Sequence, residues 1–432
     1  MPEENYRFDT QKVRAGYEPA EHNFSVQVPI YQTVSYNFKD TEHAVRLFSF
    51  TEAGWLYTRV NNPTVDALER RVAALDGGVA AVATASGMAA ITYALLNLTE
   101  GGGRIIASPY LYGGSADSFK KIYPNLGIKI DLSRNIEDPE KLDREITPDA
   151  KGVFIESISN PNGVVLDIEA LAKVAHKHGI PLVVDNTFAT PYLFNPIQYG
   201  ADVVIYSATK ALNGHGNVIA GLVVESGKFP YNNGNFPRFT EKHYTLRDGG
   251  GSERSFYEVF PEAPFTARIR LNYLNYLGAA ISPFDAYLVL LGIETLSERV
   301  QKQVASAEKI IRYLEGQKRV AWVKHPHAKG SPYKKLADKY LPRGAGAIFS
   351  FGFKGTVEES EKFINATKLF SYHVNVGDAR SLIVNSPKTT HSELTPDEKD
   401  FAQITEDTIR LSIGLEDADD LVADLEQAFI QV

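Results

Sequence analysis

Residues 201–210 read ADVVIYSATK, an apolar run that ends in hydroxyl side chains and a lysine. Its continuous apolar part predicts a buried strand over 201–207, which delivers Ser207, Thr209 and Lys210 onto a turn. Desolvation at such a strand end lowers the pKa of a lysine and makes its amine nucleophilic. A nucleophilic lysine beside hydroxyls that suit a phosphate is what a pyridoxal phosphate (PLP) Schiff-base site requires. The alternative is an ordinary lysine in a surface loop.

Composition excludes several other classes of function. The chain has 432 residues, of which 44% are hydrophobic and 23% charged, so we expect two or three domains with a large core. A net charge of −8 indicates no nucleic-acid partner and no anionic membrane surface. The absence of cysteine excludes disulfides and thiolate metal sites, and we expect no metal. The polar, acidic start and the lack of a bilayer-length apolar run suggest a cytoplasmic protein.

Short apolar runs alternate with helical patterns from about residue 66 onward. Several runs are continuously apolar, which is typical of a mostly parallel sheet covered on both faces. Helical stretches such as 168–178 would supply the crossovers, so we expect an α/β fold. The expected strands lie at 79–83, 104–107, 128–131, 152–156, 181–185, 201–207 and 221–224.

The two ends of the chain and one internal segment lack this alternation. We expect an extended N-terminal arm over 1–62, a large cofactor-binding domain over 63–284 and a smaller α+β domain over 285–432. Within the large domain, residues 226–283 are rich in aromatic, Gly and Asn residues. This composition predicts a long irregular insertion, and such insertions are usually functional or mobile.

Polar residues follow other expected strands. Asp185 ends an apolar strand, where a carboxylate needs a cation such as a protonated pyridine nitrogen; a helix N-cap or a metal ligand is the alternative. Ser86, Gly87 and Met88 open an apolar helix, whose free N–H groups suit a phosphate, although Ser86 alone would be an ordinary N-cap. No spaced glycine fingerprint follows a strand, which argues against a Rossmann dehydrogenase.

Four further residues are weaker candidates. Tyr112 follows the strand at 104–107 and could stack on a pyridine ring, or simply pack in a loop. Asn160 could bond the cofactor's phenolic oxygen, but Asn-Pro also forms turns. Arg59 in the arm could bind a phosphate, and a surface salt bridge is the alternative. Arg410 begins a late apolar strand and suits a substrate carboxylate or a structural ion pair.

Taken in order, these motifs resemble the Cys/Met-metabolism family of PLP-dependent enzymes, which have the aminotransferase-like fold type I. The resemblance covers nearly the whole chain. It is most similar to the O-acetylhomoserine sulfhydrylase branch, through PIYQT at 29–33, the stretch 210–221 and the insertion at 226–283. The motifs are YTR at 57–59, ASGM at 85–88, YGG at 112–114, Glu156 with NP at 160–161, VDNT at 184–187, SATK at 207–210, TTH at 389–391 and RLSIGLE at 410–416.

The resemblance implies a role for each candidate in cofactor binding. Lys210 would form the Schiff base and shuttle protons, Asp185 would pair with the pyridine nitrogen, and Tyr112 would stack on the ring and assist proton transfer. Asn160 would lie near the cofactor oxygen. The phosphate would be held by Ser86, Gly87, Met88, Ser207 and Thr209, joined by Tyr57 and Arg59 of a partner subunit.

The resemblance also implies substrates and an assembly. Ser381 and Arg410 would bind the substrate carboxylate, and Tyr57 would also contact the substrate. The implied reaction converts O-acetyl-L-homoserine and sulfide into L-homocysteine and acetate, in a homodimer at least and usually a homotetramer. A methionine γ-lyase, a cystathionine γ-synthase-like enzyme and a non-catalytic PLP-binding homologue are the alternatives. Residues 385–388 read NSPK where the family usually has HPAS, which leaves the preferred substrate open.

Overall fold

The central element of the fold is a seven-stranded sheet with the order β1-β7-β6-β5-β4-β2-β3. The computed structural model describes residues 6–100, 102–392 and 394–432. Strand β7 is antiparallel to both of its neighbours, and the remaining pairs are parallel. The expected α/β fold with a mostly parallel sheet is confirmed. The strands are β1 (Ala80–Thr84), β2 (Arg104–Ala107), β3 (Lys129–Leu132), β4 (Ala150–Glu156), β5 (Leu182–Asp185), β6 (Val203–Ser207) and β7 (Gly221–Glu225).

Helices pack on this sheet because its strands are apolar on both faces. Helix α3 (Pro63–Asp76) packs on β1, α4 (Gly87–Thr99) on β6 and β7, and α7 (Ile168–Lys177) on β5. The side chain of Asn62 caps the start of α3, and Gly77 ends it in the left-handed conformation with φ of 69°. The shorter elements of this region are α5 (Gly113–Lys121), η3 (Tyr123–Leu126), α6 (Pro139–Glu145), α8 (Thr190–Leu193) and η4 (Pro196–Tyr199).

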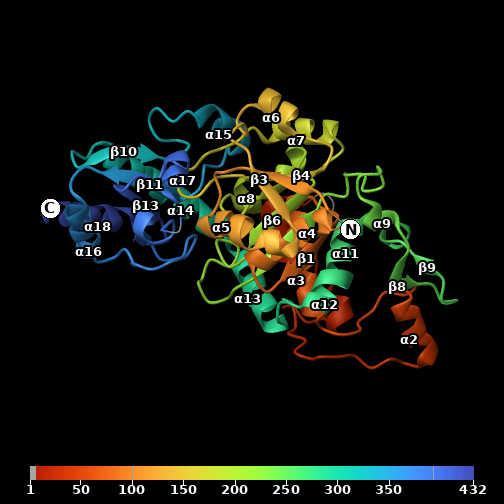
Figure 1. The fold of residues 1–432 in the computed structure, drawn as a ribbon. Coiled ribbons are helices and arrows are strands. Elements are labelled where there is room, and N and C mark those ends of the chain that lie inside the picture. The colour runs from red at the N-terminus through yellow and green to blue at the C-terminus, as the bar shows by residue number, and fades with distance from the viewer. Residues whose placement is uncertain (1–5, 101, 393) are drawn as a thin grey trace.

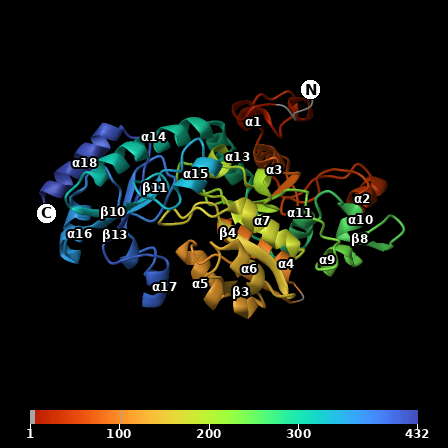
Figure 2. The same ribbon diagram turned by 90° about the horizontal axis from the view of Figure 1, so that it is seen from above.

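A second sheet has its own hydrophobic core in the C-terminal part (Figure 1). Its order is β10-β11-β13-β12, and all pairs are antiparallel. Helices α14 and α18 lie together on this part of the molecule (Figure 2). The elements are α13 (Pro283–Glu294), α14 (Leu296–Glu315), β10 (Val320–Lys324), α15 (Lys334–Tyr340), β11 (Ile348–Phe353), α16 (Val357–Ala366), β12 (Leu382–Asn385), η6 (Ser386–Lys388), α17 (Pro396–Phe401), β13 (Thr408–Ser412) and α18 (Ala418–Ile430).

The arm and the insertion are more ordered than their sequences suggest. The arm contains α1 (Phe8–Arg14), η2 (Pro19–His22) and α2 (Thr41–Phe48). The insertion lies beside α2 in both views (Figures 1 and 2), and the rings of Phe50 and Phe260 are 5.4 Å apart. Aromatic packing stabilises these short elements where periodicity gives no signal. The insertion comprises α9 (Pro237–Thr240), β8 (His243–Arg247), β9 (Glu253–Arg254), α10 (Phe256–Val259), α11 (Pro264–Arg268), η5 (Ile269–Leu274) and α12 (Asn275–Leu277).

Within the described ranges, no helix has both the length and the apolar character needed to cross a bilayer.

Candidate functional site

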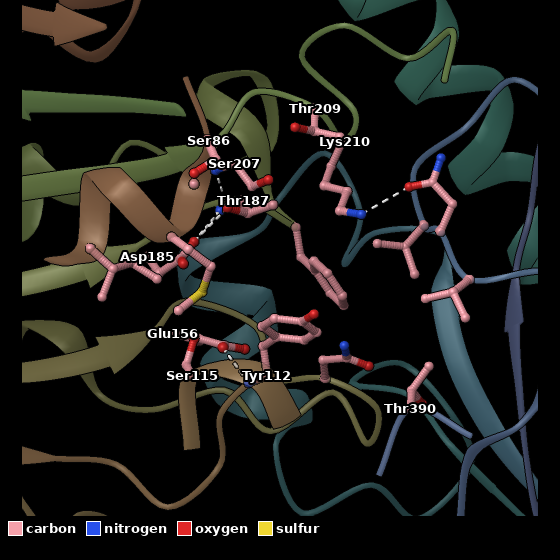
Figure 3. A pocket seen from close by; sticks show the side chains of 18 of the residues that line it. Ser86, Tyr112, Ser115, Glu156, Asp185, Thr187, Ser207, Thr209, Lys210 and Thr390 are labelled. Carbon is pink, nitrogen blue, oxygen red and sulfur yellow. Dashed lines mark hydrogen bonds between the residues drawn. The ribbon is translucent and has the colours of Figure 1, made fainter. Parts of the chain in front are cut away.

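A cavity of about 270 Å³ lies at the carboxyl ends of β4, β5 and β6. This is the edge at which parallel α/β sheets bind ligands, because polar residues that follow successive strands converge there. Figure 3 shows side chains from both halves of the molecule turned toward this space. Its lining includes Ser86, Gly87, Met88, Tyr112, Glu156, Asn160, Asp185, Thr187, Ser207, Thr209, Lys210, Asn375 and Arg410.

Lys210 enters the cavity from the turn that follows β6. Its Nζ donates a hydrogen bond to Oδ1 of Asn375 at 2.9 Å (Figure 3). Burial is the main cause that lowers the pKa of Lys210, and the cation of Arg410 lowers it further while Asp378 opposes the shift. The amine is therefore more readily deprotonated than an exposed lysine, as the strand-end position predicts.

Two carboxylates, Asp185 and Glu156, end neighbouring strands in register. Thr187 donates to Oδ1 of Asp185 through its hydroxyl at 2.5 Å and its backbone N–H at 3.0 Å. Among the described residues, Oδ2 of Asp185 has no hydrogen-bond donor. Burial raises the pKa of Asp185 to about 6, and burial together with Asp185 raises the pKa of Glu156 well above its usual value. A buried carboxylate with one free oxygen fits a protonated pyridine nitrogen.

The N-terminus of α4 approaches the end of β6 very closely. A Cβ on Gly87 would lie 2.7 Å from Cβ of Ser207, so only glycine fits there. The hydroxyl of Ser86 accepts from the N–H of Ala89 at 3.1 Å and caps the helix. The remaining N–H groups of the first turn, with the hydroxyl of Ser207 beside them, fit a phosphate. The hydroxyl of Thr209 forms hydrogen bonds with the backbone of Ala220, which directly precedes β7.

The ring of Tyr112 lies over the start of α5. Its backbone N–H donates to Oε1 of Glu156 at 2.6 Å, which anchors the residue at the cavity wall. A Cβ on Gly114 would lie 2.5 Å from Cε1 of the tyrosine ring. The ring can therefore take this position, from which it faces the cavity in Figure 3, only because residue 114 is glycine.

Arg410 brings a buried positive charge from β13 to the cavity. Its guanidinium donates to Oδ1 of Asn160 and to the carbonyl oxygen of Asn375, both at 3.2 Å. No carboxylate of the described residues lies within ion-pair distance, and burial lowers the pKa of Arg410 to about 10. A buried arginine with neutral partners has room for the carboxylate of a ligand.

Three expected site residues lie outside the lining of this cavity. The hydroxyl of Ser381 donates to Glu416 at 2.8 Å and accepts from the N–H of Gly414 at 2.9 Å. In the arm, the guanidinium of Arg59 lies 5.1 Å from the ring centre of Tyr57. These two side chains contact each other, and neither of them lines the cavity of their own chain.

Sequence reasoning missed several residues of the lining, and two of them, Thr187 and Asn375, form hydrogen bonds with site residues. Thr187 lies two positions after Asp185, and its hydroxyl also accepts from the N–H of Ser207 at 2.8 Å, so it links β5 and β6. Its place in the VDNT motif was a usable signal. Asn375 lies in a loop far from every strand-end motif, and no local pattern points to it.

The chain matches known proteins over nearly its whole length. Residues 9–430 match the family described as Cys/Met metabolism PLP-dependent enzyme. The homocysteine synthase of Schizosaccharomyces pombe is 43% identical over 99% of both chains. The O-acetyl-L-homoserine sulfhydrylase of Leptospira meyeri is 43% identical over 98% of this chain and 97% of its own.

A solved structure confirms the fold. The putative O-acetylhomoserine (thiol)-lyase of Campylobacter jejuni superposes with a TM-score of 0.92 and is 34% identical, over 98% of this chain and all of its own. That structure contains N′-pyridoxyl-lysine monophosphate.

Proposed function

Because this chain belongs to the Cys/Met-metabolism family of PLP-dependent enzymes, we propose that it is an O-acetyl-L-homoserine sulfhydrylase. The reaction replaces the γ-acetate of O-acetyl-L-homoserine with sulfide and yields L-homocysteine and acetate, an aminocarboxypropyl transfer of methionine biosynthesis. The names of relatives that are 43% identical support this substrate. The observation that carries the proposal is one cavity lined by Lys210, by Asp185 and by Arg410, which has no carboxylate partner in the described part of the chain.

The donor set of the cavity fits PLP. When bound, PLP supplies an electron sink for carbanions next to the substrate nitrogen. The first turn of α4 and Ser207 would hold its phosphate, with Met88 and Thr209 beside them. Asp185 would hold the ring nitrogen, Tyr112 would lie on the ring face, and Asn160 would lie near the phenolic oxygen.

Arg410 would bind the substrate, and Lys210 would transfer protons. Arg410 binds the substrate carboxylate and so orients the α and γ carbons toward Lys210. The amine of Lys210, which first holds the cofactor, then takes the α proton and returns protons later in the reaction. The lowered pKa of this amine favours its neutral, proton-accepting form.

Several parts of the assembly belong to the same proposal. Tyr57 and Arg59 would reach the cavity of a neighbouring subunit, in a homodimer or homotetramer. The division into 1–62, 63–284 and 285–432 and a cytoplasmic location stay predictions. So does carboxylate binding by Ser381, whose hydroxyl already bonds Glu416. In the NSPK stretch at 385–388, Lys388 pairs with Glu361 at 2.6 Å and does not line the cavity.

A direct assay tests the proposal. The purified protein, saturated with PLP, is incubated with O-acetyl-L-homoserine and sulfide, and homocysteine is measured. Lys210→Ala serves as the control and should form none. Absence of homocysteine with the wild-type protein would reject the assignment. Release of 2-oxobutyrate and ammonia from methionine would instead indicate a γ-lyase.

A further inference from the structure

Asn375 contacts the reactive amine from a loop that precedes β12. Oδ1 of Asn375 accepts a hydrogen bond from Nζ of Lys210 at 2.9 Å. The Nδ2 of the same amide donates to Oδ2 of Asp378 at 3.1 Å. A carboxylate accepts only, so Asp378 selects the nitrogen end of the amide and turns the oxygen end toward Lys210.

Asp378 is itself held in a fixed position. It is 2% exposed, and its Oδ1 accepts from the backbone N–H of Arg380 at 3.0 Å and from Nε of Arg380 at 2.8 Å. Gly216 adopts a φ of 65°, and a Cβ on it would collide with Oδ2 of Asp378. The glycine-rich stretch that follows Lys210 thus makes room for the carboxylate that orients the amide.

We propose that Asn375 is the docking position for the amine of Lys210 whenever that amine is not bonded to the cofactor, and that Asp378 is the positioning residue for the amide. The inference rests on the proposed role of Lys210, and it is independent of the leaving group and the sulfur donor. The amine is free before the cofactor binds and again while the substrate nitrogen replaces it. In the second period, the hydrogen bond to Asn375 keeps the amine close to the substrate carbons that exchange protons.

The hydrogen bond also affects the charge of the amine. An amide oxygen favours the protonated form of the amine, so its removal should lower the pKa of Lys210, and a carboxylate in its place should raise it. A general disturbance of the fold would not shift the pKa of Lys210 in opposite directions for two substitutions at position 375. Opposite shifts therefore identify the hydrogen bond between Asn375 and Lys210 as the cause. The charged and titratable groups around Lys210 are Asp378 from the same loop as Asn375, Arg410 from β13, Asp185 from β5, Glu156 from β4 and Tyr112, which directly precedes α5.

The first experiment uses the cofactor-free protein. The rate of PLP capture is followed by the visible absorbance of the bound cofactor as a function of pH. The pH midpoint of this rate should be lower in Asn375→Ala and higher in the isosteric Asn375→Asp than in the wild type. In Asp378→Asn the midpoint should also be lower, but by less than in Asn375→Ala. Asn125→Ala, the same change at an exposed position, should match the wild type. Midpoints that do not move, or that move in one direction for both substitutions at 375, would overturn the inference.

The second experiment measures proton transfer by the loaded enzyme. Exchange of the α hydrogen of L-norleucine, which has no leaving group, is followed by NMR in D₂O. Asn375→Ala should lower kcat for exchange about tenfold, with KM unchanged, because one hydrogen bond to the reacting amine is lost. An unchanged kcat would contradict the inference. Normal exchange without homocysteine formation would reject only the sulfhydrylase assignment.

Discussion

Arg410 and Asn160 are 250 residues apart in the chain, yet the arginine donates to the amide oxygen of the asparagine at 3.2 Å inside the cavity. Both side chains are buried, and the arginine has no carboxylate partner among the described residues. A buried charge without a counterion costs free energy in the ligand-free protein, and a substrate carboxylate would offset that cost.

Removal of this charge should affect binding and stability in opposite ways. Arg410→Met should raise KM for the amino-acid substrate roughly a hundredfold, because a buried charge pair contributes about 3 kcal/mol. In urea unfolding of the cofactor-free protein, the same variant should be as stable as the wild type or more so.

Arg268 provides the matched control for stability. It is equally buried, but it bonds Asn97 at 2.6 Å and Tyr273 at 2.9 Å, and it pairs with Glu100. Arg268→Met should lose about 3 kcal/mol of unfolding free energy, since it leaves these partners unsatisfied. Equal losses in both variants would show that Arg410 serves the fold rather than a ligand.

Gly114→Ala should displace the ring of Tyr112 and weaken cofactor binding. The added Cβ would lie 2.5 Å from Cε1 of the ring, and the ring is the part that can move. Loss of one stacking contact should raise the Kd for PLP about tenfold, measured by absorbance titration. Gly249→Ala, where a Cβ meets nothing within 4 Å, is the control. A wild-type Kd in Gly114→Ala would argue against stacking by Tyr112.

Asp76→Asn should remove part of the pH dependence of stability. Asp76 is buried beneath β6, where Tyr206 donates to its Oδ1 at 2.7 Å, and burial raises its pKa to about 7. A raised pKa means that the folded state binds the proton more tightly than the unfolded chain does. The resulting contribution to the free energy of unfolding is fully present below the pKa of the unfolded chain, near 4, and is lost as the pH rises through 7. Between pH 5 and 8 the wild type should lose about 3 kcal/mol more than Asp76→Asn in urea unfolding. Parallel pH profiles would contradict this assignment.

Arg59→Ala and Lys210→Ala should complement each other if the arm serves a neighbouring cavity. Each variant alone should form little homocysteine. After subunit exchange about half of the dimers are hybrids, and each hybrid has one intact site, so about a quarter of wild-type activity should return. If the activity of the mixture stays at the level of the separate variants, Arg59 does not contribute to the active site of a neighbouring subunit.

The apolar strands were predictable because burial on both faces leaves a continuous signal. The expected strand at 181–185 became β5 (Leu182–Asp185), and that at 201–207 became β6 (Val203–Ser207). The half-exposed strand β10 (Val320–Lys324) gave no such signal. Within the insertion, helices as short as α10 (Phe256–Val259) depend on aromatic contacts that arise only after folding.

The site divides in the same way. Asp185, Ser207 and Lys210 follow parallel strands, so their convergence at one edge follows from local pattern and strand direction. Ser381 illustrates the opposite case, because its hydroxyl donates a hydrogen bond to Glu416 and does not line the cavity. A one-dimensional pattern contains no information about such competition for hydrogen-bond partners.

The amino-acid sequence alone determined the α/β architecture, the cofactor chemistry and the strand-end residues, because each depends on short-range periodicity and on residue type. Tertiary structure alone decided that Arg410 has no carboxylate partner among the described residues and that Asn375, 165 residues from Lys210, contacts its amine. Those features depend on how the part of the chain that contains the second sheet packs against the first sheet, and packing between distant segments is a property of the whole chain.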